Sequence, residues 1–88
     1  MGQNHRAGGT LMGYYLDCFV WADGKFPENS YGGLSLLKAL TDAKFVLTNS
    51  KSGIKKTVIY NGDNPKEMYS FFDDKESLDT LSLYLTFS

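Results

Sequence analysis

The sequence predicts a small α+β fold, and three observations about the spacing of apolar residues carry that prediction. Residues 13–22 and 80–88 place apolar side chains at every second position, as strands do. Residues 34–43 and 65–72 place them three and four positions apart, as amphipathic helices do. Between these helices lie two short runs rich in β-branched and aromatic residues, which are typical of strands. Eighty-eight residues make one domain of this class.

The first predicted strand, residues 13–22, carries large apolar side chains on both faces. Leu16, Cys18 and Val20 share one face, whereas Tyr15, Phe19 and Trp21 share the other. The strand ends at Asp23-Gly24, which is a turn sequence. Cys18 is the only cysteine, so it cannot form an internal disulfide, and we expect a buried thiol that packs as a small hydrophobe.

The middle of the chain predicts a helix followed by a hairpin. A long connection over residues 23–33 leads to the helix at 34–43, whose apolar side is made by Leu36, Leu37, Leu40 and Ala43. Residues 44–48 then read as a strand and 54–60 as its hairpin partner. In this partner strand the register is ambiguous, and we favour a core set of Ile54, Val58 and Tyr60 over Thr57 and Ile59.

The end of the chain predicts a second helix and a last strand. Asn64 can cap the helix, Pro65 suits its first position, and Glu67 falls where a capping carboxylate reaches back. Its buried stripe would consist of Met68, Phe71 and Phe72. The last strand, residues 80–88, alternates between polar positions and Leu81, Leu83, Leu85 and Phe87.

The predicted order is βαββαβ, which is the ferredoxin-like arrangement. Right-handed crossovers place both helices on one face of a four-stranded antiparallel sheet, with strands 13–22 and 54–60 in its middle. The helices would then cover a core that consists of Leu16, Cys18, Val20, Phe45, Leu47 and the Leu81 to Phe87 set.

The opposite face of this sheet has no helix and predicts a binding surface. It would carry Tyr15, Phe19 and Trp21 on a central strand and Tyr84 on an edge strand. Contiguous exposed apolar surface usually marks an interaction site. We therefore expect a protein partner, or a second copy of the chain in a homodimer, to contact these four residues. The alternative is that the connection over residues 23–33 folds back and covers them.

An aromatic open sheet of this topology also resembles the RNA-recognition motif, which implies base stacking on the middle strands. Residues 53–60 lack the Gly-aromatic-Gly-aromatic pattern of that family, and Asp17 would repel phosphate. Lys51, Lys55 and Lys56 could contact phosphates or another anion, so single-stranded nucleic-acid binding is the alternative function. Solvated hairpin lysines that discourage edge pairing explain the same residues.

The sequence predicts no catalytic site, no metal site and no cofactor. The single histidine, His5, falls in residues 1–11, which we interpret as a leader that is flexible or was added to the natural chain, ahead of one domain at 12–88. The carboxylates near residues 73–79 lack the spacing of a calcium loop. A net charge of −1 favours neither nucleic acid nor anionic membrane, and no apolar run reaches the ~20 residues of a membrane span. We expect a non-enzymatic, cytoplasmic binding domain.

Overall fold

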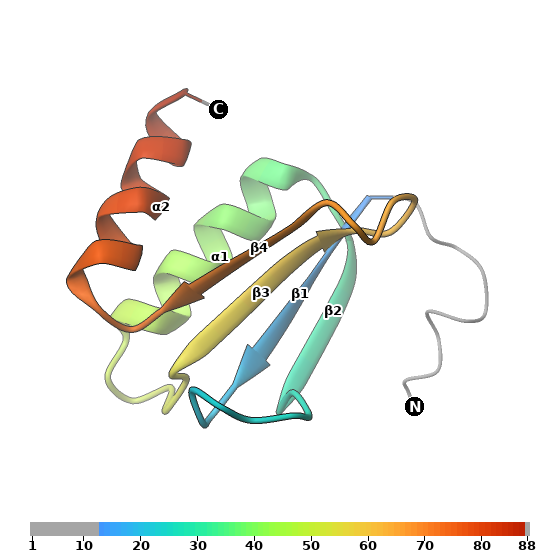
Figure 1. The fold of residues 1–88 in the computed structure, drawn as a ribbon. Helices are drawn as coiled ribbons and strands as arrows, with labels where there is room; N and C mark the ends of the chain where they lie inside the picture. Colours follow the sequence, from blue (N-terminus) through green and yellow to red (C-terminus); the bar gives the residue numbers. More distant parts are fainter. Residues whose placement is uncertain (1–12, 88) are drawn as a thin grey trace.

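The structure is a computed structural model that describes residues 13–87, and it contains four strands and two helices (Figure 1). In chain order these elements are β1 (Tyr14–Phe19), β2 (Asn29–Leu34), α1 (Leu36–Thr48), β3 (Lys56–Asn61), β4 (Met68–Phe72) and α2 (Lys75–Phe87). The chain therefore repeats a strand-strand-helix unit, and each unit ends in a helix of 13 residues.

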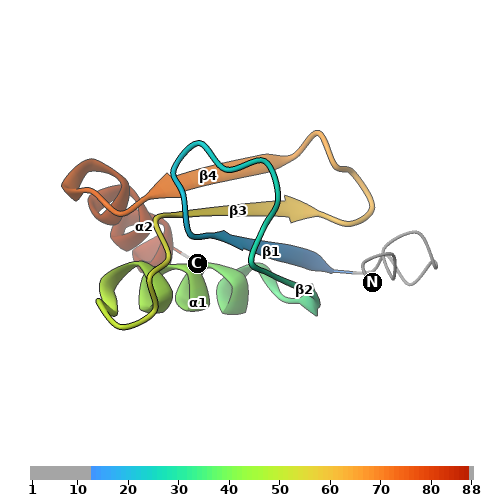
Figure 2. The ribbon, with the colours of Figure 1, turned by 90° about the horizontal axis from the view of Figure 1, so that it is seen from below.

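All neighbouring strands are antiparallel, and their order across the sheet is β2-β1-β3-β4. The first strand of each unit lies in the middle and the second lies at an edge. Both helices lie on the same side of the sheet (Figure 2). The α+β class, the four antiparallel strands, the two helices on one face and the two central strands are thus confirmed. The order along the chain is β-β-α-β-β-α, where the sequence predicted βαββαβ.

The first helix confirms the prediction and extends past it. Ser35 caps its start by accepting a hydrogen bond from the Lys38 amide at 3.0 Å. Residues 44–48, predicted as a strand, continue this helix, so that prediction is wrong. Leu47 explains the result, because it lies four positions after Ala43 and extends the same buried face. A short apolar run such as residues 44–48 fits the period of a strand and that of a helix, and here the longer helical pattern that precedes it determines the structure.

The second half of the chain differs most from the prediction. Residues 65–72 do not form a helix, because the turn over residues 62–67 leads into β4. Residues 80–88 do not form a strand, because 80–87 belong to α2. Leu81 and Leu85 fit a helix as well as a strand. They follow Leu78 by three and seven positions, so the three leucines share the buried side of α2. Asp74 caps α2 by accepting from the Ser77 amide at 2.8 Å.

The connection predicted over residues 23–33 contains the edge strand β2. Its sequence, Asn-Ser-Tyr-Gly-Gly-Leu, has no apolar alternation, so no periodicity could reveal it. β1 is also shorter than predicted, which leaves Trp21 in the turn that follows it. β2 pairs with β1, and the register of this pairing is irregular between Tyr14 and Leu16.

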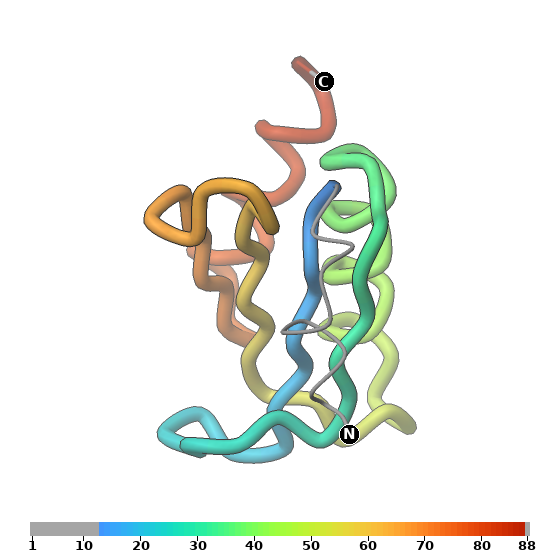
Figure 3. The backbone as a smooth tube through the Cα atoms, turned by 90° about the vertical axis from the view of Figure 1, so that its right-hand side faces the viewer, coloured from blue at the N-terminus to red at the C-terminus, as the bar shows by residue number. Residues whose placement is uncertain are grey.

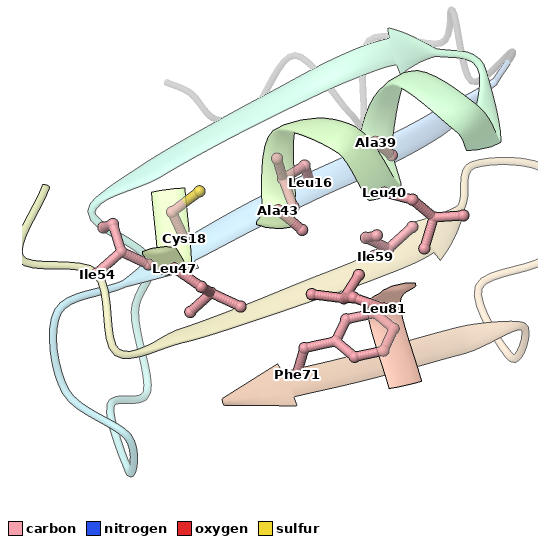
Figure 4. Close-up of a cluster of buried hydrophobic side chains, with 10 residues drawn as sticks. All are labelled: Leu16, Cys18, Ala39, Leu40, Ala43, Leu47, Ile54, Ile59, Phe71 and Leu81. Atoms are coloured by element: carbon pink, nitrogen blue, oxygen red, sulfur yellow. The ribbon is translucent and has the colours of Figure 1, made fainter. Parts of the chain in front are cut away.

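The core lies between the sheet and the helices, as Figure 4 shows. The predicted core residues Leu16, Cys18, Leu47 and Leu81 are buried, and Val20 packs against them. The core positions predicted for Phe45, Leu83 and Phe87 are wrong, because the helices turn these side chains toward solvent. The favoured register of the strand at 54–60 is also wrong in part. Ile54 is in the core, but Thr57 and Ile59 occupy the buried face of β3, and Val58 and Tyr60 lie opposite.

Candidate functional site

Two of the four predicted contact residues, Tyr15 and Phe19, lie on the helix-free face of β1, but both are buried. Tyr15 stacks on Tyr60 with ring centroids 5.3 Å apart and planes 6° from parallel. On its other side the Tyr15 ring occupies the place of a side chain at Gly32, where a Cβ would lie 2.4 Å from the ring. These contacts leave Tyr15 and Phe19 little surface for a partner.

A buried carboxylate lies between these two rings. Asp17 shares their face of β1, and its Oδ1 accepts a hydrogen bond from the Ser30 hydroxyl of β2 at 2.6 Å. A carboxylate at this position would repel a phosphate group that approached this face of the sheet.

Trp21 lies apart from the sheet face. It belongs to the turn after β1, and the Gly24 amide donates to its carbonyl at 3.1 Å. Its side chain is 70% exposed, and Phe26 in the same connection is also exposed. This connection extends past the ends of the strands in Figure 3, yet Gly24 lies next to the Phe19 ring, 3.5 Å from an added Cβ, and Gly32 lies against the Tyr15 ring. The alternative in which residues 23–33 cover the face is therefore supported for Tyr15 and Phe19 and not for the exposed Trp21.

Tyr84 is not on an edge strand, because it belongs to α2. Its ring packs edge-on against Tyr69 and Phe71 of β4, with ring centroids 6.0 Å away in both cases. Tyr84 therefore fixes α2 beside β4 while it remains 42% exposed.

The three lysines proposed as anion contacts are spread over one end of the sheet. Lys51 is exposed in the loop between α1 and β3. Lys55 pairs with Asp73 at 3.4 Å, and Lys56 lies over the Phe19 ring, 4.4 Å from its centroid. Two of the three positive charges thus already have partners within the chain.

The structure brings together a different apolar surface, which sequence reasoning missed. β4 and α2 leave large apolar side chains exposed on both sides of the β4 edge. Met68 and Phe72 project from β4 on the face away from the helices, because they pair with Tyr60 and Lys56, whereas the other exposed side chains belong to α2. We call these exposed side chains together the β4–α2 surface, made of Met68, Phe72, Leu83, Tyr84 and Phe87. Beside it, an apolar pocket of about 200 Å³ is lined by Leu36, Leu40, Tyr69, Tyr84 and Phe87. The aromatic run Met68–Phe72 was a strand signal, but the capping pattern before it indicated a helix.

A hydrogen-bonded cluster holds the start of β4 in place. The Glu67 carboxylate accepts from the Tyr69 hydroxyl at 2.7 Å, from the Tyr14 hydroxyl at 2.9 Å and from the Asn61 amide at 3.0 Å. These donors lower the pKa of Glu67, and the same carboxylate raises the pKa of Tyr69 to about 12. Glu67, predicted to cap a helix, instead ties β4 to β1 and β3.

The thiol of Cys18 is not activated as a nucleophile. Burial, with a smaller contribution from the nearby carboxylates of Asp17 and Asp42, raises the pKa of Cys18 to about 11. At neutral pH this group is protonated and packs as a core residue, as predicted.

Within residues 13–87, no group of three or more His, Cys, Asp or Glu side chains could hold a metal ion. Neither described helix has the length and apolar character needed to cross a membrane.

Together the fold and these surfaces define a small α+β domain in which β4 and α2 carry five of the ten large apolar side chains that are exposed among the described residues. Comparisons of the chain with protein-family models, with curated proteins and with solved structures find no match.

Proposed function

We propose that this chain is a non-enzymatic protein-binding domain and that its partner contacts the β4–α2 surface. The observation that carries this proposal is the concentration of exposed apolar side chains along one strand and one helix. Phe87 of α2 is 82% exposed and Met68 of β4 is 56% exposed, and Tyr84 of α2 contacts β4 through Tyr69 and Phe71. Leaving such side chains in water forfeits about 25 cal/mol for each Å² of apolar surface, and a partner would recover that free energy.

Tyr84 is the contact residue that this proposal keeps from the sequence. Aromatic rings that are held in one orientation bury a large area at a low cost in conformational entropy. Tyr69 and Phe71 hold the Tyr84 ring from one side, so its exposed edge is presented in a defined orientation. Trp21 lies in the projecting connection and would contribute only to a partner that reaches that end of the molecule.

Single-stranded nucleic-acid binding has less support. Its stacking rings, Tyr15 and Phe19, are buried, and Asp17 lies between them. Salt distinguishes the two functions, because binding that releases phosphate counterions weakens steeply as ionic strength rises, whereas apolar contact does not.

The experiment is affinity capture from cell extract with matched variants. Met68→Ser and Phe87→Ser remove exposed apolar contacts from the β4–α2 surface, and Phe26→Ser removes an equally exposed aromatic ring elsewhere. We expect a protein captured by the wild-type chain and by Phe26→Ser to be lost with the other two variants. Equal capture by all of the folded variants would refute the proposed surface.

A further inference from the structure

We infer that the outer edge of β4 accepts an extended peptide of the partner as a fifth strand of the sheet. This inference rests on the proposed function and deepens it, because it names the form of the partner and the groups that recognise it. The recognised feature would be a backbone in β conformation, with an apolar side chain toward one end and a lysine or arginine toward the other.

The first observation is a row of outward-facing backbone groups. β4 pairs with β3 alone, and the ladder between them is anchored by hydrogen bonds from the Asn61 amide to the Glu67 carbonyl and from the Asp73 amide to the Lys55 carbonyl. Because antiparallel pairs alternate, Tyr69 and Phe71 bond to β3, and Met68, Ser70 and Phe72 direct their N–H and C=O groups outward.

Part of this outward row is already used. The Phe72 amide donates to the Ser77 hydroxyl of α2 at 2.8 Å. Within the described residues, no hydrogen bond is found for the backbone groups of Met68 and Ser70 on this side. A new strand would therefore pair with both groups of Met68 and Ser70 and with the Phe72 carbonyl.

The second observation is a groove that runs beside this edge. It has a volume of about 460 Å³ and is lined by all five residues of β4 on one side and by Glu76, Ser77, Thr80 and Tyr84 of α2 on the other. Glu76, Thr80 and Tyr84 are four positions apart, so one face of the helix forms the wall. Figure 1 shows α2 rising beside β4 instead of crossing the sheet.

The third observation is that the residues of β4 themselves do not protect its edge. Natural edge strands carry lysine, proline or a bulge that prevents pairing with other chains. Met-Tyr-Ser-Phe-Phe has no charge, no proline and no glycine, and its register with β3 is regular. The residue types of β4 favour strand pairing.

The groove also indicates which side chains a peptide would carry. Tyr84, which contacts Tyr69 and Phe71, makes an apolar section of the wall. Glu76, beside the end of β4, is exposed and forms no ion pair with another residue of 13–87, whereas the neighbouring Lys75 pairs with Asp79 at 2.7 Å. A basic side chain would complement Glu76, and an aliphatic or aromatic one would fit against Tyr84.

A single strand fits this site better than a second copy of the chain does. Only two residues separate the end of β4 at Phe72 from the start of α2. A second copy that paired through its own β4 would therefore bring its own α2 to the same groove, where the two helices would compete for space. A peptide needs only the space along the edge. A homodimer formed through β4 is therefore an outcome that would overturn this inference.

The test uses peptides of about ten residues, enough to span a strand of ordinary length, selected from a random display library on the wild-type chain. Each selected peptide is synthesised unmodified and in two N-methylated forms, one methylated at the odd backbone amides and the other at the even ones. We expect one form to bind at least tenfold more weakly and the other to match the unmodified peptide, because only alternate amides face β4.

Two matched protein variants place the binding on β4. Ser70→Pro removes the outward amide at a position where an edge strand tolerates proline, and Ser70→Thr keeps that amide. We expect at least tenfold weaker peptide binding with Ser70→Pro and unchanged binding with Ser70→Thr. If Ser70→Pro does not fold, protection of the Met68 and Ser70 amides from hydrogen exchange on peptide binding to the wild-type chain takes its place.

Glu76→Lys tests the predicted charge pairing. It should weaken binding of peptides that carry the basic residue and should restore affinity for the same peptide with glutamate in that place.

Four results would overturn the inference: no enriched peptide, equal effects of the two methylation patterns, unchanged binding by folded Ser70→Pro, or a wild-type dimer that Ser70→Pro converts to a monomer in light scattering. The failure of strand addition is separable from the failure of the proposed function. If Met68→Ser and Phe87→Ser abolish capture while methylation of alternate peptide amides has no effect, the surface binds a partner by side-chain contact alone.

Discussion

The two outer strands, β2 and β4, hold equivalent places in the two strand-strand-helix units, yet they treat the sheet edge in opposite ways. β2 contains two adjacent glycines and an irregular register, and most of its residues are exposed. β4 is regular and aromatic, and Phe71 anchors it in the core. β2 thus has an irregular register, which discourages pairing with another strand, whereas β4 has neither that irregularity nor a charge or a proline.

Replacing the inward anchor of each outer strand should give the largest contrast. Phe71→Ala removes a core ring and should lower the free energy of unfolding by about 3–5 kcal/mol. Tyr31→Ala in β2 removes a half-exposed ring and should cost less than about 1 kcal/mol. Urea unfolding followed by circular dichroism measures both. Similar losses would mean that the two outer strands are equally anchored, contrary to the comparison.

The glycines of β2 provide a second contrast. Gly32→Ala would place a Cβ 2.4 Å from the Tyr15 ring, so we expect a loss of about 1–3 kcal/mol and altered NMR signals from the stacked rings of Tyr15 and Tyr60. Gly33→Ala meets no atom within 4 Å, and its φ of +71° adds only local backbone strain of about 1–2 kcal/mol. Ring signals that shift equally in both variants would contradict close packing at Gly32.

The hydrogen-bonded cluster at the start of β4 should make stability depend on alkaline pH. The folded-state pKa of Tyr69 is about 12, above the usual value of about 10, so its contribution is complete below pH 10 and is lost as the pH rises toward 12. Absorbance titration of the tyrosines and thermal unfolding across this range measure the effect. Glu67→Gln should bring the pKa of Tyr69 toward its ordinary value and should make the pH profile of stability less steep between pH 10 and pH 12. An unchanged profile in this variant would exclude Glu67 as the cause.

The connection between β1 and β2 should give the smallest effect. Trp21→Ala removes an exposed side chain from a turn, so the free energy of unfolding should change by no more than about 0.5 kcal/mol. The emission of Trp21 in the wild-type chain should resemble that of free tryptophan in water. A blue-shifted emission together with a larger loss of stability would show that the Trp21 side chain packs against the domain.

The sequence predicted the α+β class because each of three elements has a clear signal: the two faces of β1 alternate between aliphatic and aromatic side chains, β3 is rich in β-branched and aromatic residues, and most of α1 follows the helical period. The placement of Leu16 and Cys18 in the core follows from the same alternation. Residues 44–48, 65–72 and 80–88 were assigned to the wrong element because short apolar runs satisfy both periods. Leu81 and Leu85 are four positions apart, and two residues with that spacing share a face in a strand as well as in a helix. Only the contacts of α2 with α1 and β4 decide between the two structures.

The candidate site was less predictable than the fold. Trp21 and Tyr84 are exposed as predicted, but they lie on different elements and on different parts of the molecule. Met68, Phe72 and Phe87 were assigned to buried faces, and their exposure could not be read from residue type.

By itself, the sequence determined the class of the fold, the central pair of strands and the buried thiol, because these depend on the alternation of side chains along a single segment. Only the tertiary structure decided that the second strand of each unit lies at an edge, that Tyr15 is packed against Gly32 and Tyr60, and that β4 and α2 leave their apolar side chains in solvent. The physical reason is that exposure depends on which segments pack together, and residues far apart in the chain settle that.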